Sequence, residues 1–348
     1  MRLLTSKIPP LNQGSYTFRD AFFDMFTNAD AVNLASGYIS ADSLTELQEM
    51  LARNENRQVQ INLIIGMHFF EGISRVQYDA ATKLNSYLTE HERGNVSVVK
   101  DFKFHGKVYC FSRGGNPFAT IIGSSNLDDL SAAHPSFEVS ILADQENDSN
   151  IITQATNFLS RLHPTSTLPL SQWHPERFNQ ARSPLEGISN VDKATPEEFL
   201  RARQVLTQTY IDIPLKPTEK SNLNVFFGKG REGQNGFVIP RPWYEVELIA
   251  PVTVTRSENY PRQEFIAITN DGWKFKCYTG GDYNKNFRSS FDLQILGRWI
   301  KGQLEEAGVI RLGDLITADT LRNFGKDTLR MTKTEIPNTW FVELVQHV

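Results

Sequence analysis

Two short apolar segments decide the fold of the first half of the chain: FHGKVY at residues 104–109 and IIGSSNL at residues 121–127. Side chains alternate between the two faces of a β-strand, so His105 and Lys107 are expected to point the same way. An ammonium group beside an imidazole is unfavourable for packing, and it becomes useful only when an anion lies between the two groups. The first segment therefore predicts an anion site on one face of a strand.

The segments around these two runs predict an α/β domain. Strands are expected at residues 31–39, 59–67, 95–101, 104–112, 118–125 and 137–144. Helices are expected at residues 15–29, 43–54 and 74–92, and the second of these has Ser43 as its predicted N-cap with a Glu three residues on. Strands that alternate with helices through short links favour a partly parallel sheet between helices.

Five side chains form a candidate catalytic site if the strands that carry them are neighbours: His105, Lys107, Ser124, Asn126 and Glu138. The Lys and the Asn would hold the non-bridging oxygens of a phosphodiester, the His would attack phosphorus, and the Glu would fix the tautomer of the imidazole. An H-x-K pair on a strand and a G-S-S-N turn each occur without any function. Their combination at this separation favours a phosphodiester site without a metal ion.

Composition sets limits on the class of protein. The chain has 348 residues, which fits two domains, and its 36 basic and 40 acidic residues give a net charge of −4. This balance argues against coating nucleic acid by charge alone, although a local basic site remains compatible with it. The histidines are scattered, with no zinc-type spacing, so no metal site is expected.

Cysteine usage and the distribution of apolar residues favour a cytoplasmic protein. Cys110 and Cys277 each lie in a strand-like run and are expected to be buried free thiols, which suits a reducing compartment. No run reaches the ~18 apolar residues that a membrane helix needs, and residues 1–16 lack the apolar core of a signal peptide.

The second half of the chain has a different texture. The predicted organisation is a first domain at 1–170, a proline-containing linker at 171–200 and a second domain at 201–348. After residue 220 the chain consists of short β-rich runs separated by turns, with helices expected at 297–308 and 317–325. This pattern predicts a small barrel-like β domain with two short helices.

The H-x-K and G-S-x-N runs resemble the phospholipase D superfamily signature, H-x-K-x4-D-x6-G-S-x-N. The matching residues are His105, Lys107, Gly123, Ser124 and Asn126. The Asp of the signature falls at Ser112, a departure that weakens any implication of lipid chemistry. Glu138 falls where nucleases of the superfamily place an acidic residue that supports the His.

The resemblance also implies an assembly. Displacement at phosphorus needs a second group to protonate the leaving oxygen, and the superfamily uses two copies of its motif, whereas this chain has one. A twofold homodimer would bring two His105 side chains together. One would become a phosphohistidine and the other would serve as acid and then as base. No cofactor and no divalent cation are implied.

Four short motifs of the second half resemble the plant B3-type DNA-binding domain. They are Ile239-Pro240, Trp273-Lys274-Phe275, Gly297-Arg298-Trp299-Ile300 and Gly313-Asp314. In the resembled domain two loops grip the major groove, and here these would be residues 228–236 and 280–290. Arg, Lys, Asn and Gln suit base and phosphate contacts. The candidates for DNA binding are Lys229, Arg231, Gln234, Asn235, Asn284, Lys285, Asn286 and Arg288. The alternative interpretation is two solvated turns.

A phospholipase-D-like domain followed by a B3-like domain is similar to the arrangement in type II restriction endonucleases of the BfiI and NgoAVII kind. They imply DNA cleavage at or near a short sequence, a cognate DNA methyltransferase in the same system and, in some relatives, a separate ATP-dependent partner. Two alternatives remain open from the sequence. One is a nonspecific or lipid phosphodiesterase of the phospholipase D superfamily, and the other is a catalytically inactive DNA-binding regulator.

Overall fold

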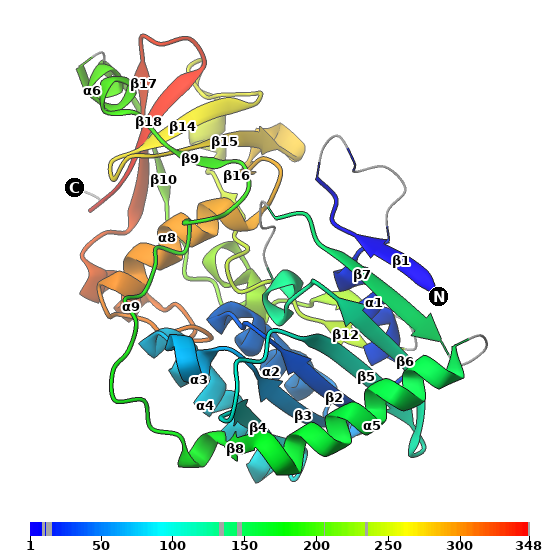
Figure 1. Cartoon of the computed structure of the whole chain (residues 1–348). Helices are drawn as coiled ribbons and strands as arrows, with labels where there is room; N and C mark the ends of the chain where they lie inside the picture. Colours follow the sequence, from blue (N-terminus) through cyan, green and yellow to red (C-terminus); the bar gives the residue numbers. More distant parts are fainter. Residues whose placement is uncertain are drawn as a thin grey trace. The chain divides into compact units, whose positions relative to one another are not determined.

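A computed structural model describes residues 1–8, 11, 16–131, 136–144, 148–204, 206–233 and 236–346 (Figure 1). The chain divides into two compact units. Unit 1 comprises residues 1–181 and 231–240, and unit 2 comprises residues 182–230 and 241–348. The division after residue 181 falls inside the predicted linker, but the assignment of residues 231–240 to unit 1 differs from the predicted boundaries.

Unit 1 is built on an eight-stranded mixed sheet with the order β1-β7-β6-β5-β2-β3-β4-β8. Its strands are β1 (Arg2–Thr5), β2 (Ala31–Ser36), β3 (Gln60–Ile65), β4 (Gly94–Val99), β5 (Lys107–Arg113), β6 (Asn116–Gly123), β7 (Val139–Asp144) and β8 (Thr167–Pro169). Strands β2, β3 and β4 are parallel to one another, and the remaining pairs are antiparallel. The predicted partly parallel sheet is confirmed.

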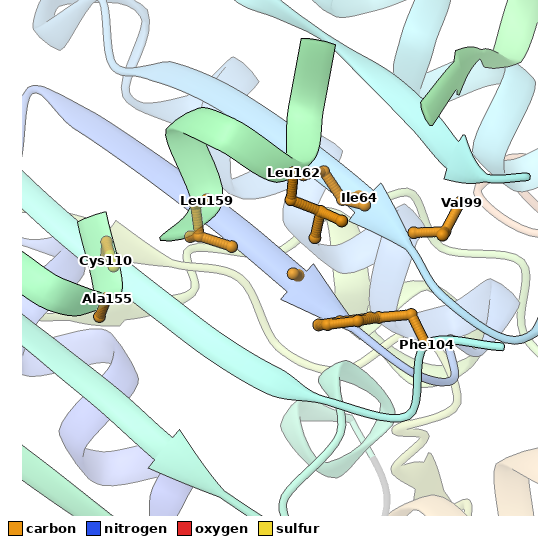
Figure 2. Close-up of a cluster of buried hydrophobic side chains, with 8 residues drawn as sticks. Ile64, Val99, Phe104, Cys110, Ala155, Leu159 and Leu162 are labelled. Carbon is orange, nitrogen blue, oxygen red and sulfur yellow. The ribbon is translucent and has the colours of Figure 1, made fainter. Parts of the chain in front are cut away.

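The helices of unit 1 cover both faces of this sheet. They are α1 (Phe18–Phe26), α2 (Ala41–Arg53), η1 (Glu55–Arg57), α3 (His68–Glu71), α4 (Arg75–Glu90), η2 (Leu127–Leu130), α5 (Ser149–Ser166) and η3 (Leu170–Gln172). Figure 2 shows Leu159 of α5 in the same buried cluster as Cys110 of β5. The neighbouring Tyr109 instead contacts the ring of Phe18 of α1. Since adjacent residues of a strand face opposite ways, α1 and α5 lie on opposite faces of the sheet.

Two local predictions are wrong in detail. Helix α2 begins at Ala41, because Ser40 is its N-cap and accepts the N–H of Ser43 at 3.3 Å. The predicted cap Ser43 instead completes a capping box from inside the helix. Strand β5 begins at Lys107 and excludes His105, because its neighbour β2 ends at Ser36, the residue that pairs with Lys107.

A hairpin from the second half of the sequence belongs to unit 1. It contains β11 (Arg231–Glu232) and β12 (Val238–Ile239). Phe237 is fully buried, and its ring centroid lies 5.8 Å from that of Phe26. The side chain of Asn54 donates to the carbonyl of Val238 at 2.8 Å and accepts the N–H of Val238 at 2.9 Å. Part of the predicted DNA-binding loop at 228–236 is therefore anchored on unit 1.

Unit 2 is rich in β-strands, as predicted. Its main sheet has the order β10-β17-β18-β14-β15-β16-β13, and β9 pairs with β15. The strands are β9 (Val191–Lys193), β10 (Leu206–Pro214), β13 (Leu248–Ile249), β14 (Phe265–Thr269), β15 (Trp273–Gly280), β16 (Asn286–Ser289), β17 (Thr328–Thr334) and β18 (Thr339–Val345).

The helices of unit 2 include the two that the sequence predicts. They are α6 (Pro196–Gln204), η4 (Asn222–Phe227), α7 (Val252–Thr255), η6 (Asp282–Asn284), α8 (Gln294–Glu306) and α9 (Ala318–Phe324). Helix α8 carries the Gly-Arg-Trp-Ile motif, and a Cβ atom at Gly297 would lie 1.7 Å from the carbonyl oxygen of Tyr244. Only glycine allows this approach of helix and backbone.

Two further expectations concern the chain as a whole. Cys110 and Cys277 are buried and unpaired, as expected. Within the residues that the structure describes, no helix is both long and apolar enough to span a membrane.

Candidate active site and DNA-binding loops

The ends of four neighbouring strands of unit 1 meet at one end of the sheet. Strand β5 runs antiparallel to β2, so the start of β5 at Lys107 lies beside the end of β2 at Ser36. Strand β6 ends at Gly123, which pairs with Ser140 near the start of β7. The segments that carry all five predicted catalytic side chains begin or end here, which confirms that their strands are neighbours.

His105 and Lys107 are in direct contact. The Nζ atom of Lys107 lies 3.1 Å from Nε2 and 3.2 Å from Nδ1 of His105, and it donates to the carbonyl oxygen of His105 at 2.8 Å. Lys107 is only 5% exposed. Burial lowers the pKa of its ammonium, while nearby carboxylates, that of Glu138 first, act in the opposite direction. The pair thus places a buried cation beside an imidazole.

Asn126 joins this pair across the end of β2. Its Oδ1 atom accepts the peptide N–H of Tyr38 at 3.1 Å, which leaves the amide NH₂ group as a donor for an anion. A Cβ atom on Gly37 would lie 3.3 Å from Cα of His105 and 3.5 Å from Oδ1 of Asn126. His105 and Asn126 therefore both lie against the backbone at Gly37, and His105 makes the closer approach.

The other two predicted residues, Ser124 and Glu138, lie at the same end of the sheet. Ser124 uses its hydroxyl on the backbone of Val139, donating to the carbonyl at 3.2 Å and accepting the N–H at 2.9 Å. Among the described residues, the Glu138 carboxylate makes no hydrogen bond to His105, and its charge acts on Lys107. Catalytic roles for Ser124 and Glu138 stay predictions.

Three residues near His105 were missed by sequence reasoning. The ring centroid of Tyr38 lies 5.5 Å from that of His105, edge to face. Its hydroxyl donates to Glu71 at 2.7 Å, and Glu71 also pairs with Lys103 at 3.2 Å. These hydrogen bonds lower the pKa of Glu71, with the one from Tyr38 as the largest cause. The sequence offered one indication of Tyr38: it lies two residues after the end of β2, the strand that pairs with β5.

A fourth missed residue is Asp129, whose side-chain carboxyl group has a raised pKa. Asp129 accepts the peptide N–H of Asn126 at 2.8 Å. Burial raises the pKa of Asp129 to about 7, and the charges of Asp128 and Glu138 add to this shift. The signal in the sequence was the adjacent acidic pair that follows Asn126.

Ser112, which replaces the Asp of the signature, lies away from this cluster. It is five residues from Lys107 along β5, or about 17 Å, and it pairs with Ala31 and Pro117 at the other end of the sheet. Ten residues separate Ser112 from Gly123, where the signature has six. The replacement at Ser112 therefore removes no group from beside His105.

The DNA-binding candidates fall into two groups. Asn284, Lys285, Asn286 and Arg288 lie together in unit 2, on η6, the turn after it and strand β16. Lys285 is 4.0 Å from Asp282, and Arg288 is 3.3 Å from Glu247 with its guanidinium over the ring of Tyr278. In the other group Lys229 is exposed, Arg231 is in β11 of unit 1, and Gln234 and Asn235 lie outside the described residues. The role of every one of these residues stays a prediction.

No group of three or more His, Cys, Asp or Glu side chains that could hold a metal ion occurs in the described part of the chain. The cluster at His105 combines a cation, an amide and an imidazole, and this combination suits an anion.

Comparisons with known proteins identify both halves of the chain. Residues 17–163 match the family model described as the NgoFVII restriction endonuclease N-terminal PLD domain. Residues 201–335 match the model described as the NgoFVII C-terminal B3-like DNA-binding domain. No curated protein matches the chain.

The solved structures that are similar to part of the chain include a polyphosphate kinase from Porphyromonas gingivalis. The two chains are 13% identical, with a TM-score of 0.31 over 52% of this chain and 26% of that chain. This likeness supports no inference. The two family models instead decide the assignment, and the chain belongs to the phospholipase D superfamily restriction endonucleases that carry a C-terminal B3-like DNA-binding domain.

Proposed function

We propose that the protein is a type II restriction endonuclease. It hydrolyses phosphodiester bonds of double-stranded DNA at or near a specific short sequence, without a metal ion. The observation that carries this proposal is the convergence of His105, Lys107 and Asn126 at one end of the sheet. The B3-like domain of the same chain supplies the sequence recognition.

The geometry supports a two-step reaction. A nitrogen of His105 attacks phosphorus, forming an N–P bond while the bond from phosphorus to the leaving oxygen breaks. Lys107 and the NH₂ group of Asn126 stabilise the charge on the non-bridging oxygens. Water then hydrolyses the phosphohistidine and restores the free imidazole.

The leaving oxygen must gain a proton, and a second chain supplies it. The described residues contain one H-x-K pair, so a homodimer provides the second His105 as general acid in the first step and as general base in the second. An active site shared by the two chains of a dimer would explain why each chain carries a single H-x-K motif.

The biological setting follows from the chemistry. An enzyme that cuts DNA in the cytoplasm endangers its own host, so a DNA methyltransferase of the same specificity must protect the host sites. Some relatives work with a separate ATP-dependent protein, and such a partner is part of the proposal for this chain.

Digestion of a mapped plasmid and a mapped viral genome in EDTA tests the function. We expect discrete fragments from the wild type and none from His105→Ala. His91→Ala is the matched control, because His91 follows α4 at the opposite end of the sheet from the site, and it should cut like the wild type. A smear would indicate a nonspecific phosphodiesterase. Binding of these DNAs without cleavage would indicate an inactive regulator.

A further inference from the structure

An exposed aromatic side chain stands out on the surface of unit 2. Tyr283 is 78% exposed, the highest value for a large hydrophobic side chain among the described residues. It lies in η6, in the turn that connects β15 to β16. This turn also holds Asn284 and Lys285 of the predicted DNA-binding loop, and the Tyr283 side chain makes no hydrogen bond or ring contact with another described residue.

The backbone that carries Tyr283 adopts an unfavourable conformation and is held in it. Tyr283 and Asn284 have φ values of +57° and +53°, in the left-handed region that a bulky residue seldom occupies. The hydroxyl of the buried Tyr260 donates to the carbonyl of Asn284 at 3.0 Å, and the carbonyl of Lys285 accepts the N–H of Ala250 at 2.8 Å. The surrounding structure thus fixes a strained turn that projects the ring outward, a pattern typical of functional sites.

Tyr283 lies between Asp282, whose carboxylate favours contact with bases, and Lys285, whose ammonium is 4.0 Å from that carboxylate. The neighbouring Asp282 side chain is 87% exposed, and it would repel the phosphate backbone. In the major groove, a carboxylate can instead accept a hydrogen bond from the amino group of cytosine. An apolar ring in the same groove suits the methyl group of thymine.

We propose that Tyr283 reads a thymine of the recognition sequence by contact between its ring and the 5-methyl group. This inference rests on the proposed DNA-binding function and adds a specificity-determining residue to it. Tyr283 carries no charge, so the contact changes sequence preference and leaves the salt dependence of binding unaltered.

The test uses the full chain with His105→Ala, which prevents cleavage during binding. A pool of random double-stranded oligonucleotides yields the preferred sequence, and each thymine in it is then replaced by deoxyuridine, which lacks the methyl group. We expect one replacement to weaken binding about fourfold, the effect of one buried methyl group. Tyr283→Ala should abolish this difference between thymine and deoxyuridine and weaken binding about tenfold. Tyr283→Phe should keep the wild-type affinity and the wild-type sensitivity to deoxyuridine.

Tyr210→Ala is the matched control. Tyr210 is 57% exposed on β10, which four strands separate from β16 in the strand order, and its substitution should leave sequence preference unchanged. If Tyr283→Ala selects the same sequence with the same sensitivity to deoxyuridine, the role of Tyr283 is wrong while DNA recognition stands. If the His105→Ala protein selects no sequence from the pool, the proposed function and the proposed role of Tyr283 are both wrong. A changed slope of affinity against salt would assign Tyr283 to the phosphate backbone and also overturn the proposal.

Discussion

The peptide N–H of Tyr38 donates a 3.1 Å hydrogen bond to Oδ1 of Asn126, joining the end of β2 to the turn after β6. This bond decides which end of the Asn126 amide is available to a substrate. Because the oxygen is occupied by a backbone donor, the NH₂ group is the part that can face a phosphate oxygen. The backbone just after β2 thereby fixes the orientation of an amide side chain that lies 88 residues later in the sequence.

Asn126→Asp tests this orientation. The carboxylate keeps an acceptor for the Tyr38 N–H, but it replaces the NH₂ donor by a negative charge that repels the phosphodiester. We expect cleavage to fall by about 10² to 10³, the effect of losing one donor to a developing oxyanion, with little loss of stability. Single-turnover cleavage and urea unfolding give the two quantities. Asn157→Asp on the exposed side of α5 is the control, and equal activity of both variants would contradict the role of Asn126.

Gly37→Ala tests the close approach of His105 to the backbone. The new methyl group would lie 3.3 Å from Cα of His105, so the backbone of His105 must shift by a few tenths of an ångström and carry the imidazole with it. Displacements of this kind slow a positioned reaction, and we expect cleavage to fall at least tenfold while DNA affinity stays within about twofold. Cleavage at the wild-type rate would show that His105 tolerates displacement.

The alternation of strands and helices predicted the fold of unit 1, because hydrophobic periodicity reports local structure directly. It also gave strands that are too long: the first predicted strand ends at residue 39, whereas β2 ends at Ser36, where Gly37 begins the turn into the site. The docking of Phe237 against Phe26 was beyond prediction, because the partners are about 200 residues apart and neither shows a local signal.

For the candidate site, the sequence predicted the residues whose chemistry forms a recognisable motif. His105, Lys107 and Asn126 belong to this group. Tyr38 and Asp129 were missed because their relation to His105 and Lys107 depends on the pairing of β2 with β5 and on burial. Contacts between strands depend on register, which a single sequence does not specify.

Phe237→Ala tests whether the hairpin β11–β12 contributes to unit 1. Removing a fully buried ring that packs on Phe26 should lower the free energy of unfolding of unit 1 by about 3–5 kcal/mol. Phe178→Ala is the control, because Phe178 is partly exposed and should cost much less. Urea unfolding of the full chain, monitored by hydrogen exchange of the α2 amides, measures the free energy of unfolding of unit 1. Equal stability of the two variants would show that the hairpin is not anchored.

The final prediction concerns the pH dependence that Asp129 gives to unit 1. Its folded pKa of about 7 lies above its ordinary value of 3.8. Between these two pH values the folded chain keeps a proton that the unfolded chain releases, so the contribution of Asp129 to stability falls as pH rises from about 4 to about 7. Above pH 7 both states are ionised and the penalty for burying the charge is complete.

Asp129→Asn removes this titration and keeps an oxygen that can accept the N–H of Asn126. We expect the variant to match the wild type near pH 4 and to exceed its free energy of unfolding at pH 8 by on the order of 1–3 kcal/mol. The difference should rise between about pH 4 and pH 7 and level off above pH 7, as measured by urea unfolding at each pH. Asp101→Asn, an exposed control beside Lys100, should show no such rise. A variant less stable than the wild type at pH 8 would show that the Asp129 carboxylate is stabilised by its surroundings, and its raised pKa would then be wrong.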